Sequence, residues 1–334
     1  MNRTLWLLLA GLIAVLAIPL TLGGTDLLHL LSGFPLSLLA LMLGMVLLCW
    51  VANGAKLRLL LAGRAGRLGQ TRATGIVIAS EFAFSATPGG SGGPLTLIAL
   101  LNRHGVRPAQ TTAIFAIDQI IDLLFFLGAM MSMMIYIISR SLDARLGWLL
   151  ALPMSILVVL LVTVLLMGRY HRQVLLLSGR LLGRLRVRPR MRRAIARRIL
   201  TFKQAFTETL RLPWWALAGA FLLGLVHWLL RYSVLYITLY GLGQHLDWVW
   251  TFLVQMLSMA AGQLTLLPGG AGGAELSASA LLSPIVGQST AAAAILIWRA
   301  VTYYFYLIAG APVFMLLAGK PLLKRIMSGR SEQA

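Results

Sequence analysis

Long apolar stretches dominate the pattern of hydrophobic and polar positions along the chain. A helix that crosses a bilayer needs about 20 apolar residues, and the pattern predicts full spans at 5–22, 34–52, 111–138, 147–168, 213–240 and 290–318. Two further apolar stretches, 74–100 and 248–287, are each interrupted by a Pro-Gly-Gly run. Because broken helices at membrane depth need protein or water around them, we interpret both stretches as re-entrant hairpins of two half-helices.

The first apolar stretch has two interpretations. Arg3 precedes it and Gly23-Gly24 follows it, as in a secretory signal peptide. The apolar core is long, however, and no A-x-A cleavage site accompanies it. We therefore predict an uncleaved membrane anchor.

Composition agrees with a membrane protein and excludes other classes. Hydrophobic residues make up 59% of the 334 residues, charged residues only 11%, and the mean hydropathy is +0.86. Soluble domains carry about 25% charged residues, so a soluble or a disordered chain is excluded. The net charge of +20 would suggest nucleic acid in a soluble protein; here it indicates cationic loops that face anionic lipid. A single cysteine, Cys49, excludes a disulfide framework and a cysteine-based zinc site.

The positions of Lys and Arg predict the orientation, because short loops rich in these residues stay in the cytoplasm. With the N-terminus inside, 25 of the 29 basic residues fall inside, two fall outside and two lie within spans. Segments 53–73 (which includes Lys56) and 169–212 carry most of the inside charge. Treating either hairpin as a full crossing would put basic segments outside, so the charge pattern supports re-entrance independently. It predicts a bacterial inner-membrane protein with both termini in the cytoplasm.

An internal repeat relates the two hairpins. Pro88 begins a P-G-G-x-G-G pattern that recurs at Pro268, an offset of 180 residues, and the same offset superimposes span 34–52 on 214–232. Gln119 and Arg299 each lie 31 residues after the proline of their copy. The copies cover roughly 34–138 and 214–318. Since one hairpin enters from the cytoplasm and the other from outside, we predict an inverted-topology repeat, as in many secondary transporters that work by alternating access. Chance recurrence of glycine-rich packing motifs is the alternative.

Ionisable residues at membrane depth cost about 3 kcal/mol each on insertion scales, so they are rarely idle. The candidates are Glu81, Asp118, Asp122, Arg231, Glu275 and Arg299. Asp118 and Asp122 share one helix face, as do His227 and Arg231, because residues four apart align; Tyr303 follows Arg299 by one turn.

Each candidate also has a purely structural interpretation. Arg299 could form a fixed ion pair with one acid, and Glu275 could merely cap the half-helix that follows Gly273. Glu81 could lie near the cytoplasmic interface. Asp118 and Asp122 could face a lumen merely because of where their span ends. A histidine in the position of His227 is more often a packed polar residue than a ligand.

A half-helix is predicted to begin near 92 and another near 272. Their free N–H groups and positive dipole ends form an anion site, to which Arg231 and Arg299 add charge. A lipid phosphate is the natural anion in a membrane, and the planar arginine fork suits it. If all of these groups are ionised, four acids against two arginines leave a net negative charge. We therefore expect at least one carboxyl to be protonated, bound to a cation or in water. A protonatable carboxyl suits proton-coupled transport, or a headgroup that carries an amine.

The basic segment before 213 contains an amphipathic pattern. Apolar residues recur at three- and four-residue steps over 190–210, with Arg190, Arg193 and Arg197 between them and Pro189 at the first turn. We interpret it as a helix on the inner membrane surface; a loop that only fixes topology is the plainer alternative. Nothing else in the sequence supports nucleic-acid binding.

Motifs of common enzymes are absent. The sequence contains no P-loop, no G-x-S-x-G and no H-E-x-x-H, and its five histidines are scattered. We predict no cofactor, no metal and no enzymatic activity.

The paired P-G-G-x-G-G hairpins, the acid-bearing span after the first and Arg299 after the second resemble the flippase-like transmembrane family. This family comprises the membrane half of lysylphosphatidylglycerol synthase (multiple peptide resistance factor) and its stand-alone relatives, and the resemblance covers roughly 5–320. The family's first copy often reads Glu-Arg-x-x-Asp, where this chain has Asp118-Gln119 and Asp122, so the ionic role shifts to Arg299; Glu275 matches the acid after the second motif. The resemblance implies an all-α polytopic protein that moves lipid between leaflets. The chain is expected to lack the soluble aminoacyl-transferase domain of the full synthase.

We therefore predict one transmembrane domain over 1–334 that moves a phospholipid, anionic or aminoacylated, through a polar cavity between the hairpins. A membrane enzyme that modifies a lipid headgroup, with Asp118 and Asp122 as its only acid pair, is one alternative. A non-transporting partner subunit of an envelope enzyme is another, and a homo-oligomer is possible. The predicted translocation path contains Glu81, Pro88, Gly89, Gly90, Gly92, Gly93, Asp118, Gln119, Asp122, Arg231, Pro268, Gly269, Gly270, Gly272, Gly273, Glu275, Arg299 and Tyr303.

Overall fold

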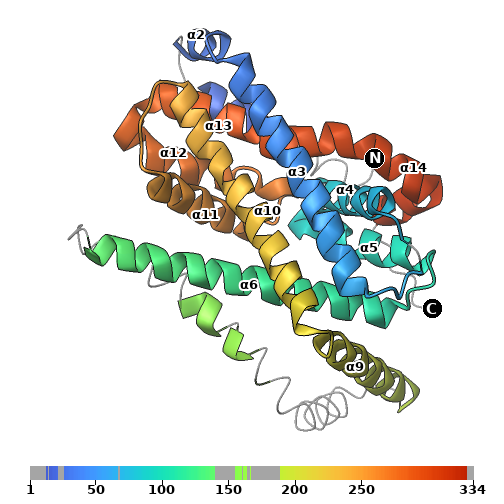
Figure 1. Ribbon diagram of the computed structural model, residues 1–334. Helices are drawn as coiled ribbons and strands as arrows, with labels where there is room; N and C mark the ends of the chain where they lie inside the picture. The colour runs from blue at the N-terminus through green and yellow to red at the C-terminus, as the bar shows by residue number, and fades with distance from the viewer. Residues whose placement is uncertain are drawn as a thin grey trace. The chain divides into compact units, whose positions relative to one another are not determined.

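A computed structural model of the chain describes residues 13, 15–21, 26–66, 68–139, 155–159, 161–163, 166 and 189–328. Within these residues every regular element is a helix (Figure 1). This confirms the predicted all-α integral membrane class.

Four helices are long and apolar enough to cross a membrane. They are α3 (Leu36–Leu61), α6 (Pro108–Ser139), α10 (Trp214–Gly241) and the run from α13 (Gln288–Arg299) through η3 (Ala300–Tyr304) into α14 (Phe305–Ser328). They match the predicted spans 34–52, 111–138, 213–240 and 290–318. The predicted end of the first of these was wrong, because the helix continues through the mixed polar and apolar residues after 52 as far as Leu61. Lys56, assigned to a cytoplasmic segment, is a buried residue of α3.

The other two predicted spans fall largely outside the described residues. Of 5–22, the part Val15–Thr21 is helical and is followed, across a bend of 118°, by α2 (Asp26–Ser32). This bent pair is a fifth candidate crossing. Of 147–168, only residues 155–159, 161–163 and 166 are described, and all of them are helical.

Contacts divide the chain into two compact units, which we describe separately. The first comprises Met1–Arg58, Gly63–Gly105 and Leu225–Ala334; the second comprises Leu59–Ala62 and Val106–Gly224. In the second unit α6 packs against α9 (Pro189–Leu210). Helix α9 confirms the amphipathic helix predicted for 190–210, with Pro189 at its first position. Phe202 and Phe206, one turn apart, are in ring contact at 5.8 Å.

Both stretches predicted as re-entrant hairpins form a pair of packed helices around a turn in the first unit, and their re-entrance into a membrane stays a prediction. Helices α4 (Gln70–Ala86) and α5 (Gly92–Asn102) flank the turn η1 (Pro88–Gly90), and α11 (Trp248–Leu264) and α12 (Gly273–Val286) flank η2 (Pro268–Gly270). The two turns have the same backbone conformation: φ and ψ are 59° and 17° at Gly89, and 64° and 14° at Gly269. The residue after each also has a positive φ. Only glycine adopts this left-handed conformation without strain, which explains why both copies carry Gly-Gly after the proline.

The two turns contact each other. The Gly89 N–H donates to the Leu266 carbonyl at 3.2 Å, so the tip of one hairpin is bonded directly to the tip of the other. Leu266 itself has a φ of 54°, a left-handed conformation that is unusual for a branched residue. The contact between the tips therefore includes a strained backbone position, at a residue other than glycine.

The first hairpin is fixed to α14, which packs closely along α4. The rings of Phe82 and Phe314 lie 5.1 Å apart. Arg103, just after α5, donates to the carbonyls of Leu317 and Ala318 at 2.6 and 3.0 Å. Those carbonyls precede Gly319, where a φ of 73° ends the regular part of the helix. A cation at these carbonyls satisfies groups that a helix end leaves open.

Helix α3 and the C-terminal part of α10 pack with opposite chain directions. Thr238 donates to the Met42 sulfur at 3.4 Å, and the Cys49 thiol donates to the His227 carbonyl at the same distance. Residue numbers thus rise on one helix as they fall on the other, and the two helices are antiparallel neighbours (Figure 1).

The N-terminal residues cover part of the second hairpin. Val15 is buried against Ala271 and Tyr303. Leu27 of α2 packs against Ala292 and Ala293 of α13. The two halves of the bent N-terminal pair thus cover different parts of this region: Val15 packs beside η2 and η3, and α2 packs on α13.

The contact between α4 and α14 depends on a small residue, which gives a first prediction. A Cβ atom at Gly310 would lie 2.7 Å from the Cβ of Phe82, so Gly310→Ala is expected to lower the free energy of unfolding by about 1–3 kcal/mol through overpacking. The measurement is the melting temperature of the purified protein in detergent. Gly44→Ala is the matched control, because no atom lies within 4 Å of its Cβ position; it should be neutral or stabilise by up to about 1 kcal/mol. Equal melting temperatures for both variants would contradict this packing.

Candidate functional site

The first unit contains two polar clusters within its apolar helices. The Arg299 cluster consists of Met259, Gly269, Glu275, Trp298, Arg299 and Tyr303. The Arg231 cluster consists of Trp50, Asn53, Glu81, Arg231 and Tyr306. Both contain residues of the predicted path, together with residues that the sequence did not point to.

Arg299 lies where the last predicted span changes its winding. Helix α13 ends at Arg299, and residues Ala300–Tyr304 form the π-helical turn η3 before α14 begins. Turns of this kind inside a longer helix are rare and often mark functional sites. The wider turn changes the direction in which the following side chains leave the helix, so the spacing predicted from an ideal helix does not apply to Tyr303.

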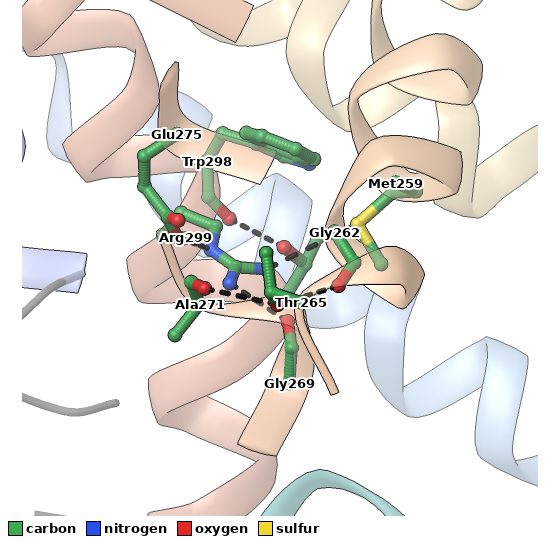
Figure 2. Close-up of polar contacts among 9 residues, drawn as sticks. Met259, Gly262, Thr265, Gly269, Ala271, Glu275, Trp298 and Arg299 are labelled. Atoms are coloured by element: carbon green, nitrogen blue, oxygen red, sulfur yellow. Dashed lines mark hydrogen bonds and ion pairs between the residues drawn. The ribbon is translucent and has the colours of Figure 1, made fainter. Parts of the chain in front are cut away.

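The Arg299 guanidinium is bonded on several sides (Figure 2). Its Nε donates to Glu275 Oε1 at 2.5 Å, and its Nη2 donates to the Gly269 carbonyl at 2.8 Å. Its Nη1 lies 4.0 Å from the Met259 sulfur. One side chain therefore links α13 to α11, α12 and the second Pro-Gly-Gly turn.

Aromatic rings complete this enclosure. The guanidinium carbon lies 4.9 Å from the ring centre of Tyr303 and 5.6 Å from that of Trp298, within the range of cation–π attraction. Tyr303 also packs on the turn itself, since a Cβ atom at Gly269 would lie 2.0 Å from its ring. Gly269 is thus required both by its φ and by the ring above it.

The pair formed by Glu275 and Arg299 is closed off from solvent. Glu275 is 0% and Arg299 1% exposed. The Glu275 carboxylate bonds Arg299, so it does not cap α12, which was one interpretation of its position. Its second oxygen, Oε2, has no hydrogen-bond partner among the described residues, and the same is true of the Tyr303 hydroxyl. A buried polar atom left unsatisfied is costly, which favours a site whose contacts change in another state.

Thr265 supports the second turn from below. Its hydroxyl lies 2.8 Å from the Gly262 carbonyl and 3.2 Å from the Ala271 carbonyl, as Figure 2 shows. In the first hairpin Thr87 has a comparable role: its hydroxyl donates to Ala83 at 2.7 Å and accepts the Gly92 N–H at 2.8 Å. The first N–H of α5 is therefore already occupied, which weakens the predicted anion site at that half-helix.

The Arg231 cluster is formed by α3, α4, α10 and α14. The Glu81 carboxylate accepts one hydrogen bond on each oxygen, from Trp50 Nε1 at 2.9 Å and from Asn53 Nδ2 at 3.0 Å. Arg231 Nη1 donates to the Tyr306 hydroxyl at 2.5 Å. The guanidinium carbon of Arg231 lies 4.7 Å from the Tyr306 ring centre. In this cluster each charged side chain is bonded to neutral side chains: Glu81 of α4 to two residues of α3, and Arg231 of α10 to Tyr306 of α14.

The predicted acids of α6 belong to the second unit. Asp118 and Asp122 are half-buried and lie one turn apart on one helix face, while Gln119 is exposed. The structure therefore brings together Glu275, Arg299, Tyr303 and the second turn, and separately brings together Glu81 and Arg231. Pro88, Gly90, Gly93, Pro268, Gly270, Gly272 and Gly273 lie at or beside the turns.

Several residues of these clusters were missed by sequence reasoning. Trp50, Asn53 and Tyr306 lie on spans whose composition is ordinary for a membrane helix, so no local signal marks them. Of the three, Asn53 alone offered a local signal, because it is a polar amide next to the predicted end of a span. Within the described residues, no group of three or more His, Cys, Asp or Glu side chains is placed to hold a metal ion.

These features define an integral membrane protein with two broken helical hairpins whose tips meet beside buried charges. Residues 7–310 match the family described as the lysylphosphatidylglycerol synthase TM region, and the chain belongs to this family. It is also similar to a UPF0104 membrane protein of Archaeoglobus fulgidus, with 22% identity over 271 residues, which are 78% of this chain and 81% of that protein. The resemblance seen in the sequence is thereby confirmed, and a lipid-related role follows from the family.

The closed ion pair gives a second prediction. Arg299→Gln leaves the Glu275 carboxylate buried without a cation, and is expected to cost about 3–5 kcal/mol of stability. Replacing both partners, with Glu275→Leu and Arg299→Met, removes the stranded charge and should recover a large part of that loss. The measurement is again the melting temperature in detergent, with Arg211→Gln on the exposed surface as the matched control. Equal losses in the single and double variants would show that the pair is not coupled.

Proposed function

We propose that the protein moves a phospholipid headgroup between the leaflets of the bilayer, along a path beside the two hairpin tips. The observation that carries this proposal is the direct bond between the tips, Gly89 N–H to Leu266 carbonyl, with charged side chains buried next to it. Non-helical backbone at membrane depth is typical of transport sites. Membership of the family adds support, because the family is lipid-related.

Two observations support the inverted repeat that the sequence predicts. The two Pro-Gly-Gly turns share their backbone conformation. Helices α3 and α10, which the offset of 180 residues places in equivalent positions, are antiparallel neighbours. Equivalent helices of an inverted repeat have opposite directions, so this packing is the arrangement that such a repeat requires.

In this proposal the Arg299 cluster holds the second hairpin closed. Arg299 bonds the turn through Gly269 and bonds α12 through Glu275, so releasing it frees both at once. An unsatisfied Glu275 oxygen and Tyr303 hydroxyl are available to partners in a second state. Alternating access then consists of the second hairpin moving against α13, while the first hairpin stays attached to α14 by Arg103.

Further parts of the proposal concern setting and chemistry. The protein acts as one transmembrane domain in a bacterial inner membrane, with both termini in the cytoplasm. It works as a transporter and not as an enzyme, alone or as a homo-oligomer or beside an envelope enzyme. Its partners are phospholipids.

Transport in reconstituted vesicles is the direct test. Phospholipids that carry a fluorescent label on an acyl chain are placed in both leaflets, and dithionite quenching reports the fraction that reaches the outer leaflet. The protein is expected to move lipid well above the rate of protein-free vesicles. Arg299→Ala should lower that rate by at least tenfold, because the second hairpin loses its attachment; Arg211→Ala, an exposed arginine, is the control.

Two outcomes would count against the proposal in different ways. No transport above protein-free vesicles contradicts the function. Transport that is equal in the native protein and in Arg299→Ala contradicts the role given to the Arg299 cluster. The double variant Glu275→Leu with Arg299→Met regains stability but also lacks the attachment, so it should lose transport too; restored transport in it would show that the loss in Arg299→Ala reflects instability.

Lipid analysis of a deletion strain separates a transporter from an enzyme. A transporter leaves the inventory of lipid species unchanged by mass spectrometry and alters their distribution between leaflets, as measured with an impermeant amine reagent. The absence of one lipid species in the deletion strain would instead favour an enzyme that modifies a headgroup.

A further inference from the structure

Opposite charges in the Arg231 cluster are close together but not paired. Glu81 and Arg231 interact electrostatically, yet they do not form a direct ion pair of the kind that joins Glu275 to Arg299. In a low-dielectric setting, direct pairing is the usual way to reduce the cost of two buried charges. A site that keeps such charges apart therefore requires an explanation.

Neutral partners hold the two charges apart. Trp50 and Asn53 each donate to one oxygen of Glu81, and Tyr306 accepts from Arg231. The Trp50 and Tyr306 rings meet edge to face at 5.1 Å, and Phe305 stacks on Trp50 at 5.4 Å. A continuous series of contacts thus runs from the carboxylate to the guanidinium and fixes both ends. On the far side, Gln255 donates to the Arg231 backbone carbonyl at 3.1 Å and fixes that helix position.

Both charged groups also keep capacity for a ligand. A carboxylate accepts about four hydrogen bonds and a guanidinium donates five; Glu81 accepts two and Arg231 donates one. Glu81 and Arg231 are half-buried, whereas Glu275 and Arg299 are fully enclosed. The Arg231 cluster is therefore the one of the two that a headgroup can reach without first breaking an ion pair.

We infer that the Arg231 cluster recognises a zwitterionic phospholipid headgroup, with the phosphate on Arg231 and the ammonium on Glu81. This inference rests on the proposed function and adds the substrate class to it. A headgroup that carries both signs of charge can satisfy both groups at once, and each partner completes a charge-assisted hydrogen bond. A purely anionic headgroup would satisfy Arg231 but would add a second negative charge beside Glu81, which is repulsive.

The test compares three lipids of different headgroup charge in the vesicle assay. Phosphatidylethanolamine, phosphatidylcholine and phosphatidylglycerol carry the label on an acyl chain, so that the headgroups stay intact. The native protein is expected to move phosphatidylethanolamine at least tenfold faster than phosphatidylglycerol. Phosphatidylcholine, which has the same charges but cannot donate a hydrogen bond from its ammonium group, is expected to fall between them.

Two substitutions separate the roles of the charges. Glu81→Gln should lower transport of phosphatidylethanolamine by about tenfold, as expected for one lost charge-assisted bond, and should leave that of phosphatidylglycerol unchanged or faster. Arg231→Gln should slow all three lipids. The matched controls make the same chemical changes at the exposed residues Glu208 and Arg211 of the second unit: Glu208→Gln and Arg211→Gln should leave all rates unchanged.

The outcomes distinguish this inference from the proposed function. If the native protein moves the zwitterionic and anionic lipids equally, the inference is wrong while the transport function stands. If no lipid is moved, the transport function fails, and binding decides the inference: native mass spectrometry of the detergent-purified protein should retain phosphatidylethanolamine over phosphatidylglycerol. Equal retention of both lipids overturns the inference, and this comparison in the native protein does not depend on whether the variants fold.

Discussion

A broken helix leaves backbone groups that need hydrogen-bond partners within the protein wherever water is absent, as in the hydrocarbon core of a bilayer. Each Pro-Gly-Gly turn interrupts a helix, so its polar groups must find partners within the protein. At the second turn these partners are the Arg299 guanidinium and the Thr265 hydroxyl. At the first they are the Thr87 hydroxyl and, across the contact between the tips, the Leu266 carbonyl. The polar network therefore supplies the partners that the interrupted helices lack.

The same constraint leads to two different treatments of buried charge. Arg299 is surrounded by an acid, a backbone carbonyl and two aromatic rings, and this arrangement holds one hairpin to its neighbouring helix. Arg231 is kept apart from Glu81 by neutral donors and acceptors and retains free donors. A closed pair stabilises one conformation, whereas a separated pair keeps hydrogen-bonding capacity, which our proposal assigns to a lipid headgroup. The two arginines, equivalent in a count of charges, thus have different physical roles.

The net charge of the ionisable residues in the apolar helices is less informative than which of them lie next to one another. Counting four acids against two arginines predicts a negative deficit over the whole membrane region. In the structure Glu275 balances Arg299, Glu81 acts with Arg231, and Asp118 and Asp122 belong to α6 in the second unit. Because electrostatic energy falls with distance and rises with burial, a charge is balanced only by its neighbours. Lys56 is a further charge that the sequence count misplaced: it was assigned to a cytoplasmic segment, but it is a buried residue of α3.

The sequence by itself determined the features that depend on neighbouring residues. Apolar runs specified the helices, prolines and glycines specified the two broken hairpins, and the recurrence after 180 residues indicated their common design. Only the tertiary structure decided which side chains meet. Trp50, Asn53 and Tyr306 became partners of Glu81 and Arg231 because four distant helices converge there, and the π-helical turn after Arg299 set the direction of Tyr303. No local pattern encodes such contacts, since on a membrane helix a lipid-facing aromatic residue and a site-facing one have the same sequence signature.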